Sequence, residues 1–99
     1  MENNGTKYIL SVNKMLSGIA IHTPAQIYDT EREAIAIMNA KIDYEVNNAL
    51  GLANGKQWTD KMAKEANIEV SVEDNEAHVK YLNNPSADYT YYYIDEVTM

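Results

Sequence analysis

The segment YDTEREA, residues 28–34, constrains the fold most, because it carries a helix start that depends only on local chemistry. Thr30 and Glu33 form a capping box, in which each side chain accepts a hydrogen bond from the backbone amide of the other residue. Acidic residues in the first turn also favour the positive end of a helix dipole. Apolar residues then recur at spacings of three and four on one helical face: Ile35, Met38, Ile42, Val46 and Ala49. With Gly51 as the stop, the pattern predicts a helix from about 31 to 49.

Ile37 and Tyr44 lie off that stripe, seven positions apart and therefore on one common face of the helix. They either widen the core face or touch a second element, and we expect the core. After the break GLANGKQW, residues 56–66 predict a short second helix, with an irregular loop as the alternative. Its apolar residues recur at every fourth position: Trp58, Met62 and Ala66. We expect Trp58, the only tryptophan, to lie in the core.

Strand patterns occupy both ends of the chain. Near the N-terminus Tyr8, Leu10 and Val12 alternate with polar residues, and a Ser-Gly turn at 17–18 leads to a possible returning strand at 19–22. The last third predicts three more strands, at 68–72, 77–82 and 89–97, with a loop at 83–88 that contains a proline. Short connections imply antiparallel pairing. We therefore predict a single α+β domain over 1–99, with a two-layer arrangement of four to five antiparallel strands and one long helix on one face.

The composition gives little support to catalysis. The chain has no cysteine and two histidines, and its four glycines form no phosphate-binding loop. The acidic residues around Glu73 and Glu76, with His78, resemble a solvated hairpin turn more than a metal site. We therefore expect no enzyme activity, no metal and no cofactor. The N-terminus lacks the pattern of a signal peptide, and no apolar run is long enough for a membrane span, so we expect a soluble, cytoplasmic protein.

The formal net charge of −7 is concentrated toward the C-terminus. From Glu69 onward there is one base, Lys80, against seven acids, a net of −6. Direct nucleic-acid binding needs the opposite sign, and anionic membranes are disfavoured for the same reason. The alternative is that acidity only keeps the chain soluble. If charge selects a partner, it selects a protein with a basic surface.

The closing segment DYTYYYIDEVTM, residues 88–99, contains four tyrosines within five positions. In a regular strand Tyr89, Tyr91 and Tyr93 project from one face, and Tyr92 and Ile94 from the other. One side is expected to close the core, and the other to contact a partner. The candidate partner-binding residues are those tyrosines with the neighbouring acids: Tyr89, Tyr91, Tyr93, Asp88, Asp95 and Glu96. The alternative is a cross-strand tyrosine ladder that only stabilises an exposed sheet face.

The stretches KYILSV and HTPAQIYDTEREAIAIMNAKIDYEV, within residues 7–46, resemble small proteins encoded by phages and prophages. The shared features are a short N-terminal strand, a Thr-Pro connection and a helix that starts at YDT-x-x-EA. Most such proteins have no assigned activity, and those with known roles are often small acidic binders that block host enzymes or defence systems. The resemblance implies a class of role and transfers no site residue.

Three functional hypotheses remain. The first is a non-enzymatic acidic binding module, of the phage-inhibitor type, that occludes a basic surface of a host protein through the tyrosine-rich strand. The second is a small-ligand binder or sponge of nucleotide type, in which tyrosines line a pocket between the subunits of a homo-oligomer. The third is a structural subunit that self-associates through an open sheet face or edge.

Overall fold

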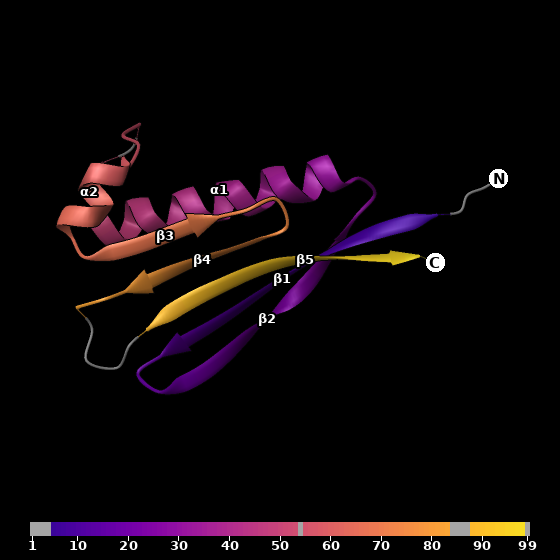
Figure 1. Cartoon of the computed structure of the whole chain (residues 1–99), viewed down its shortest axis with the longest axis horizontal. Helices are drawn as coiled ribbons and strands as arrows, with labels where there is room; N and C mark the ends of the chain where they lie inside the picture. The colour runs from indigo at the N-terminus through magenta and orange to yellow at the C-terminus, as the bar shows by residue number, and fades with distance from the viewer. Residues whose placement is uncertain (1–4, 54, 84–87, 99) are drawn as a thin grey trace.

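The computed structural model describes residues 5–53, 55–83 and 88–98. It confirms the α+β class, because one long helix packs against one face of a five-stranded antiparallel sheet (Figure 1). The predicted loop at 83–88 lies mostly outside the described residues, since 84–87 are not among them. The elements in chain order are β1 (Thr6–Leu16), β2 (Ile19–Tyr28), α1 (Glu31–Leu50), α2 (Asp60–Glu65), β3 (Ile68–Val72), β4 (Glu76–Tyr81) and β5 (Tyr89–Thr98).

Helix α1 begins and ends where the sequence predicts, to within one residue. The Thr30 side chain accepts a hydrogen bond from the backbone N–H of Glu33 at 3.1 Å, so the N-cap is confirmed. At the other end Gly51 adopts a left-handed conformation with φ 67°, and its N–H bonds the carbonyl oxygens of the last turn. A residue with a Cβ is disfavoured in that conformation, which is why the helix stops at a glycine.

The buried face of α1 consists of four residues at every fourth position: Ala34, Met38, Ile42 and Val46. Three of them belong to the predicted stripe, whereas Ile35 is only half-buried and Ala49 is exposed. Ile37 packs partly against the core, but the prediction for Tyr44 is wrong, because this side chain is 72% exposed. Ile35 and Ala49 both lie on the helical face of the four buried residues, so the helical period alone does not explain their greater exposure.

The sheet order is β2-β1-β5-β4-β3, with every neighbouring pair antiparallel. Strands β1 and β2 form a hairpin around the two-residue turn Ser17–Gly18, whose φ values are 51° and 79°. Positive φ at both positions is the geometry that a two-residue hairpin prefers. The predicted returning strand at 19–22 is confirmed and continues to Tyr28, beyond an irregularity in the register opposite Ser11. Strand β2 tolerates Pro24 because it is an edge strand.

The segment before α2 is anchored to α1 through Trp58. Its indole Nε1 donates to the Asp43 carboxylate at 2.9 Å, and its backbone N–H donates to Asn47 Oδ1 at 2.8 Å. The short helix is confirmed, but its predicted apolar face is wrong: Ala63 is buried, while Met62 is exposed. Helix α2 is only six residues long, so its orientation is set by the anchor rather than by its own periodicity.

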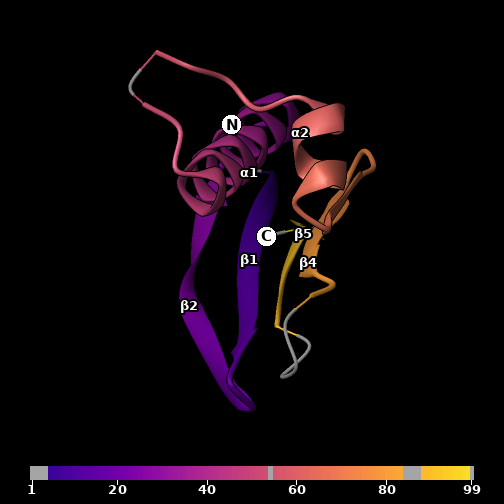
Figure 2. The ribbon, with the colours of Figure 1, turned by 90° about the vertical axis from the view of Figure 1, so that its left-hand side faces the viewer.

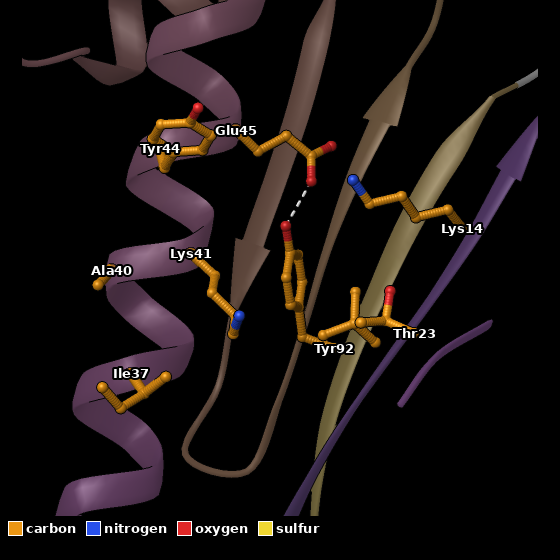
Figure 3. A pocket seen from close by; sticks show the side chains of 9 residues that line it. Lys14, Thr23, Ile37, Ala40, Lys41, Tyr44, Glu45 and Tyr92 are labelled. Carbon is orange, nitrogen blue, oxygen red and sulfur yellow. Dashed lines mark hydrogen bonds between the residues drawn. The ribbon is translucent and has the colours of Figure 1, made fainter. Parts of the chain in front are cut away.

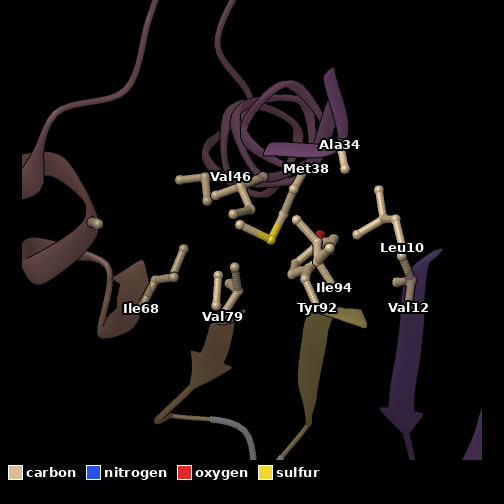
Figure 4. Packing of buried hydrophobic residues seen from close by; sticks show 12 residues of the cluster. Leu10, Val12, Ala34, Met38, Val46, Ile68, Val79, Tyr92 and Ile94 are labelled. Atoms are coloured by element: carbon tan, nitrogen blue, oxygen red, sulfur yellow. The ribbon is translucent and has the colours of Figure 1, made fainter. Parts of the chain in front are cut away.

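The hydrophobic core lies between α1 and the sheet, and side chains from both layers meet there (Figure 4). Seen along the sheet, α1 and α2 lie on the same side, and the opposite side carries neither helix (Figure 2). None of the helices in the described residues is long and apolar enough to cross a membrane. The core residues are Leu10, Val12, Ala34, Met38, Ile42, Val46, Ala63, Ile68, Ala77, Val79, Tyr92 and Ile94.

Candidate functional site: the open face of the sheet

Strand β5 separates its tyrosines as the alternation predicts. Tyr92 is 2% exposed and points toward α1 with Ile94, whereas Tyr91 is 38% exposed on the opposite face. Tyr89 and Tyr93 share the face of Tyr91 and are half-buried. We call this helix-free side of the sheet the open face. The tyrosine-rich segment therefore serves both the core and a surface.

On the open face Tyr91 and Tyr93 form an aromatic pair. Their ring centroids are 5.8 Å apart and their planes meet at 84°, the edge-to-face arrangement that aromatic rings favour. The strands on either side carry polar residues opposite these rings. In β1, Asn13 lies opposite Tyr91 and donates from its side-chain amide to the Tyr93 hydroxyl at 3.5 Å, a long hydrogen bond. The rings thus lie in a polar frame that holds their geometry but leaves Tyr91 open to solvent.

Acidic residues lie on the side of this aromatic pair that is nearest the turn between β3 and β4. Glu76 begins β4 opposite Tyr93, and its carboxylate accepts a hydrogen bond from the Tyr91 hydroxyl at 3.2 Å. The charge of Glu76 is the largest cause of a raised pKa for Tyr91, and Glu73 contributes as well. Asp95 follows Tyr93 on the same face of β5. We call these five residues, Glu73, Glu76, Tyr91, Tyr93 and Asp95, the acidic tyrosine patch.

A shallow depression of about 420 Å³ lies within the acidic tyrosine patch. The turn between β3 and β4 closes one end of it, because the carbonyl oxygen of Asn75 accepts a hydrogen bond from the Ile94 N–H at 2.8 Å. This bond fixes the acids of that turn relative to the tyrosines of β5. The depression is lined by Asn13, Asn75, Glu76, Tyr91, Tyr93, Ile94 and Asp95.

Two of the six candidate residues lie elsewhere. Asp88 is 9% exposed, and its carboxylate accepts a hydrogen bond from the Ser17 N–H at 2.9 Å, which ties the start of β5 to the turn of the first hairpin. Glu96 lies opposite Tyr8 and so projects from the helix side of the sheet. Asp88 and Glu96 are close to the tyrosines in sequence, but alternation directs the even-numbered residues of this strand toward the helix side of the sheet.

Glu73, Glu76 and Asn13 also belong to this surface, although they are not among the residues predicted from the sequence. The two acids could have been found from the sequence, because they flank the turn between the two predicted strands that precede the last strand in the chain. What was missing was the strand order, which places β4 on one side of β5 and β1 on the other. Tyr89 does lie on the open face, between Met15 and Lys80, outside the acidic end.

Facing α1, the hydroxyl groups of three residues converge on one carboxylate. Tyr81 and Thr90 donate to Glu45 Oε2 at 2.5 and 2.7 Å, and Tyr92 donates to Glu45 Oε1 (Figure 3). Burial, followed by the hydrogen bond to Glu45, raises the pKa of both Tyr81 and Tyr92 well above the usual range. A carboxylate that accepts from three neutral donors is satisfied without a cation. This cluster is a fixed internal support for the sheet.

Beside that cluster, a groove of about 430 Å³ separates α1 from β1 and β2. The side chains of Lys14 and Lys41 extend into the space between helix and sheet (Figure 3). Neither lysine belongs to an ion pair among the described residues. The groove is lined by Val12, Lys14, Thr23, Ile37, Ala40, Lys41, Tyr44, Glu45 and Tyr92.

The histidines on the open face have structural partners. His78 contacts the Glu69 carboxylate at 2.8 Å, and His22 Nδ1 lies 2.5 Å from Asn13 Oδ1. Within the described ranges, no group of three or more histidine, aspartate or glutamate side chains is arranged to hold a metal ion. Comparison of the chain with family models, with curated proteins and with solved structures finds no match.

Proposed function

We propose that this chain is a non-enzymatic, acidic protein-binding module whose acidic tyrosine patch contacts a basic surface of another protein. The observation that carries the proposal is the pairing of Tyr91 with Tyr93 on the open face, beside the carboxylates of the acidic tyrosine patch. Tyrosine rings supply contact area at a low cost in conformational entropy, and they are enriched in protein interfaces. The edge-to-face contact between the rings favours binding further, because it restricts the side-chain conformations that would have to be fixed on association.

Charge supports the same choice of partner. No lysine or arginine lies directly opposite the acids of the acidic tyrosine patch on a neighbouring strand. At the other end of the open face, by contrast, Lys80 Nζ lies 4.0 Å from Glu69 Oε2. An acidic surface with a net charge of the same sign attracts a basic partner over a distance of about a Debye length, roughly 8 Å at physiological salt. Together with the resemblance to phage-encoded binders, this favours inhibition by occlusion of a basic surface on a host protein.

The test is affinity capture from a bacterial lysate on the immobilised protein, at about 50 mM and about 300 mM salt. We expect a partner with a basic surface to be retained at low salt, released at high salt and lost from the double variant Tyr91→Ala/Tyr93→Ala. The matched control is Tyr44→Ala, which removes an exposed tyrosine from α1 and is expected to keep the partner. Equal retention by the double variant, or no retained partner at low salt, contradicts the proposal.

The groove beside α1 favours a second candidate function, the binding of a small anionic ligand of nucleotide type. Two lysines at a groove with Tyr44 and apolar side chains provide cations for a phosphate and a surface for a base. A thermal-shift panel of nucleotides tests it, because a ligand that binds the folded state raises Tm with its concentration. We expect Lys14→Met/Lys41→Met to abolish the shift and Lys61→Met, on α2, to keep it. A panel without any shift eliminates this candidate.

A further inference from the structure

Strand β2 forms an edge of the sheet that carries no formal charge, although the protein as a whole is acidic. Residues 19–27 are all exposed, on both faces of the strand, and the sequence IAIHTPAQIY contains no acid, lysine or arginine. The opposite edge is managed differently: β3 is five residues long, carries Glu69 and is packed against α2. Natural sheets protect their edges with charges, short strands or covering elements. Prolines and bulges also protect edges, and β2 has Pro24 with a register irregularity beside it, but neither lies within residues 19–23.

The hairpin geometry shows where the β2 edge is free. Leu16 and Ile19 flank the two-residue turn and form the first pair of the hairpin, which is hydrogen-bonded. From there, non-hydrogen-bonded and hydrogen-bonded pairs alternate along the two strands. That alternation directs the backbone N–H and C=O groups of Ala20 and His22 away from β1. The next outward position is Pro24, which has no N–H. The free edge therefore runs over residues 19–23 and has two complete donor–acceptor sets.

We propose that two copies of this chain pair through residues 19–23 of β2, antiparallel and centred on Ile21, into one continuous ten-stranded sheet. In that register Ala20 lies opposite His22 of the second copy, so the two outward-facing sets of each chain meet those of the other. Each of these two pairs forms two backbone hydrogen bonds. The segment is thus complementary to itself, as a twofold interface requires.

Side chains near the hairpin turn add apolar contact to this pairing. Leu16, Ile19 and Ile21 project from the helix side, and Ile19 and Ile21 are 64% and 42% exposed because the turn end of the hairpin lies far from both helices (Figures 1 and 2). In the proposed register, Ile21 faces Ile21 of the second copy as a non-hydrogen-bonded pair, whose Cβ atoms are about 4.5–5.5 Å apart. Burial of Ile19 and Ile21 against β2 of the second copy stabilises the pair.

Charge selects a second copy as the occupant of this edge. Each copy carries −7, so two copies approach best where neither has a formal charge. The nearest charge to Ile21 on its face is Lys14, its partner on β1. The two Lys14 residues of the pair are three strand spacings apart, about 14 Å, which is beyond the Debye length of about 8 Å. A basic partner is attracted instead to the acidic tyrosine patch, which this pairing leaves uncovered. The pairing thus goes beyond the proposed binding function.

Sedimentation equilibrium over about 1–500 μM tests the pairing, since a short apolar strip gives a dissociation constant on the order of micromolar. We expect the mass to rise from the 11.2 kDa of one chain toward twice that value. Ile21→Lys, which sets two like charges face to face, and His22→Pro, which removes an edge donor, are each expected to weaken association at least about tenfold. The matched control Ile27→Lys lies beyond Pro24 and keeps the wild-type curve. A single chain mass at every concentration overturns the proposal.

A disulfide test locates the twofold axis independently of any charge. Because the chain has no native cysteine, Ile21→Cys places one thiol of each copy opposite the other, at a Cβ separation close to the roughly 3.5–4.5 Å of a disulfide. We expect mild oxidation to link Ile21→Cys within the dimer at low micromolar concentration, and Ile27→Cys to react at least about tenfold more slowly. Equal rates for the two variants, or faster linkage through Ile27→Cys, overturn the proposed register.

Discussion

The two faces of β5 use the same residue type for opposite purposes. Tyr92 is buried against α1 and its hydroxyl donates to Glu45, while Tyr91 is partly exposed to solvent and its hydroxyl donates to Glu76. Both are tyrosines bonded to a glutamate, and they are neighbours in the chain. They differ in what surrounds the pair, since one carboxylate is enclosed by three hydroxyl donors and the other lies on an open sheet.

This difference indicates that the two faces of β5 have different roles, one in stabilising the fold and the other in forming a surface. A hydrogen bond to a carboxylate is strong where water cannot compete, and adds little where it can. The helix side of β5 should therefore carry the stability of the fold, and the open side should be replaceable without unfolding. That division is what allows a binding surface to be tested by mutation in a folded protein.

The largest effect is expected for truncation of the buried ring. Tyr92→Ala removes a fully packed side chain and leaves Glu45 short of a donor, so we expect a loss of about 3–5 kcal/mol in the free energy of unfolding. Tyr91→Ala, one position earlier, should cost less than about 1 kcal/mol, since its ring is exposed. Urea unfolding followed by Trp58 fluorescence measures both. Similar losses for the two variants would break the division by face.

The carboxylates of Glu45 and Glu76 allow the same comparison between the two faces, with smaller expected effects. Glu45→Gln keeps the shape of the side chain but replaces one acceptor oxygen with a donor, so at least one of the hydroxyls of Tyr81, Thr90 and Tyr92 loses its partner. We expect a loss of about 1–3 kcal/mol. Glu76→Gln, the matched change on the open face, should stay within about 0.5 kcal/mol of the wild type. A cost for Glu76→Gln equal to that for Glu45→Gln would contradict the account.

The pH dependence sharpens the comparison without mutation. Tyr81 and Tyr92 have a raised pKa in the folded state, whereas an unfolded tyrosine ionises near pH 10. Above about pH 10 the unfolded chain releases protons that the folded chain retains, so the free energy of unfolding should fall as pH rises further and be flat between about 7 and 9 with respect to these groups. Tyrosine absorbance against pH should show ionisation of Tyr81 and Tyr92 only as the chain unfolds. Full titration of all eight tyrosines in the folded chain would contradict this.

Much of this fold was predictable from sequence because its signals are local. The cap at Thr30, the stop at Gly51 and the alternation of β5 each depend on a few neighbouring residues, and the structure confirms all three. The difference between the partly buried Ile37 and the exposed Tyr44 was not predictable from the helical period, because the two share a face and differ in their place along α1. The membership of the acidic tyrosine patch depends on strand order: Glu73 and Glu76 join it across the sheet, while Asp88 is drawn into a bond with Ser17.

The most direct test of the central claim is calorimetric titration of the captured partner into the wild-type chain, the double variant Tyr91→Ala/Tyr93→Ala and the control Tyr44→Ala. The account predicts that the double variant stays folded by circular dichroism yet binds at least about 100-fold more weakly, which corresponds to about 2.7 kcal/mol. The control should bind as the wild type does. A folded double variant with unchanged affinity would contradict the assignment of the open face as the binding surface.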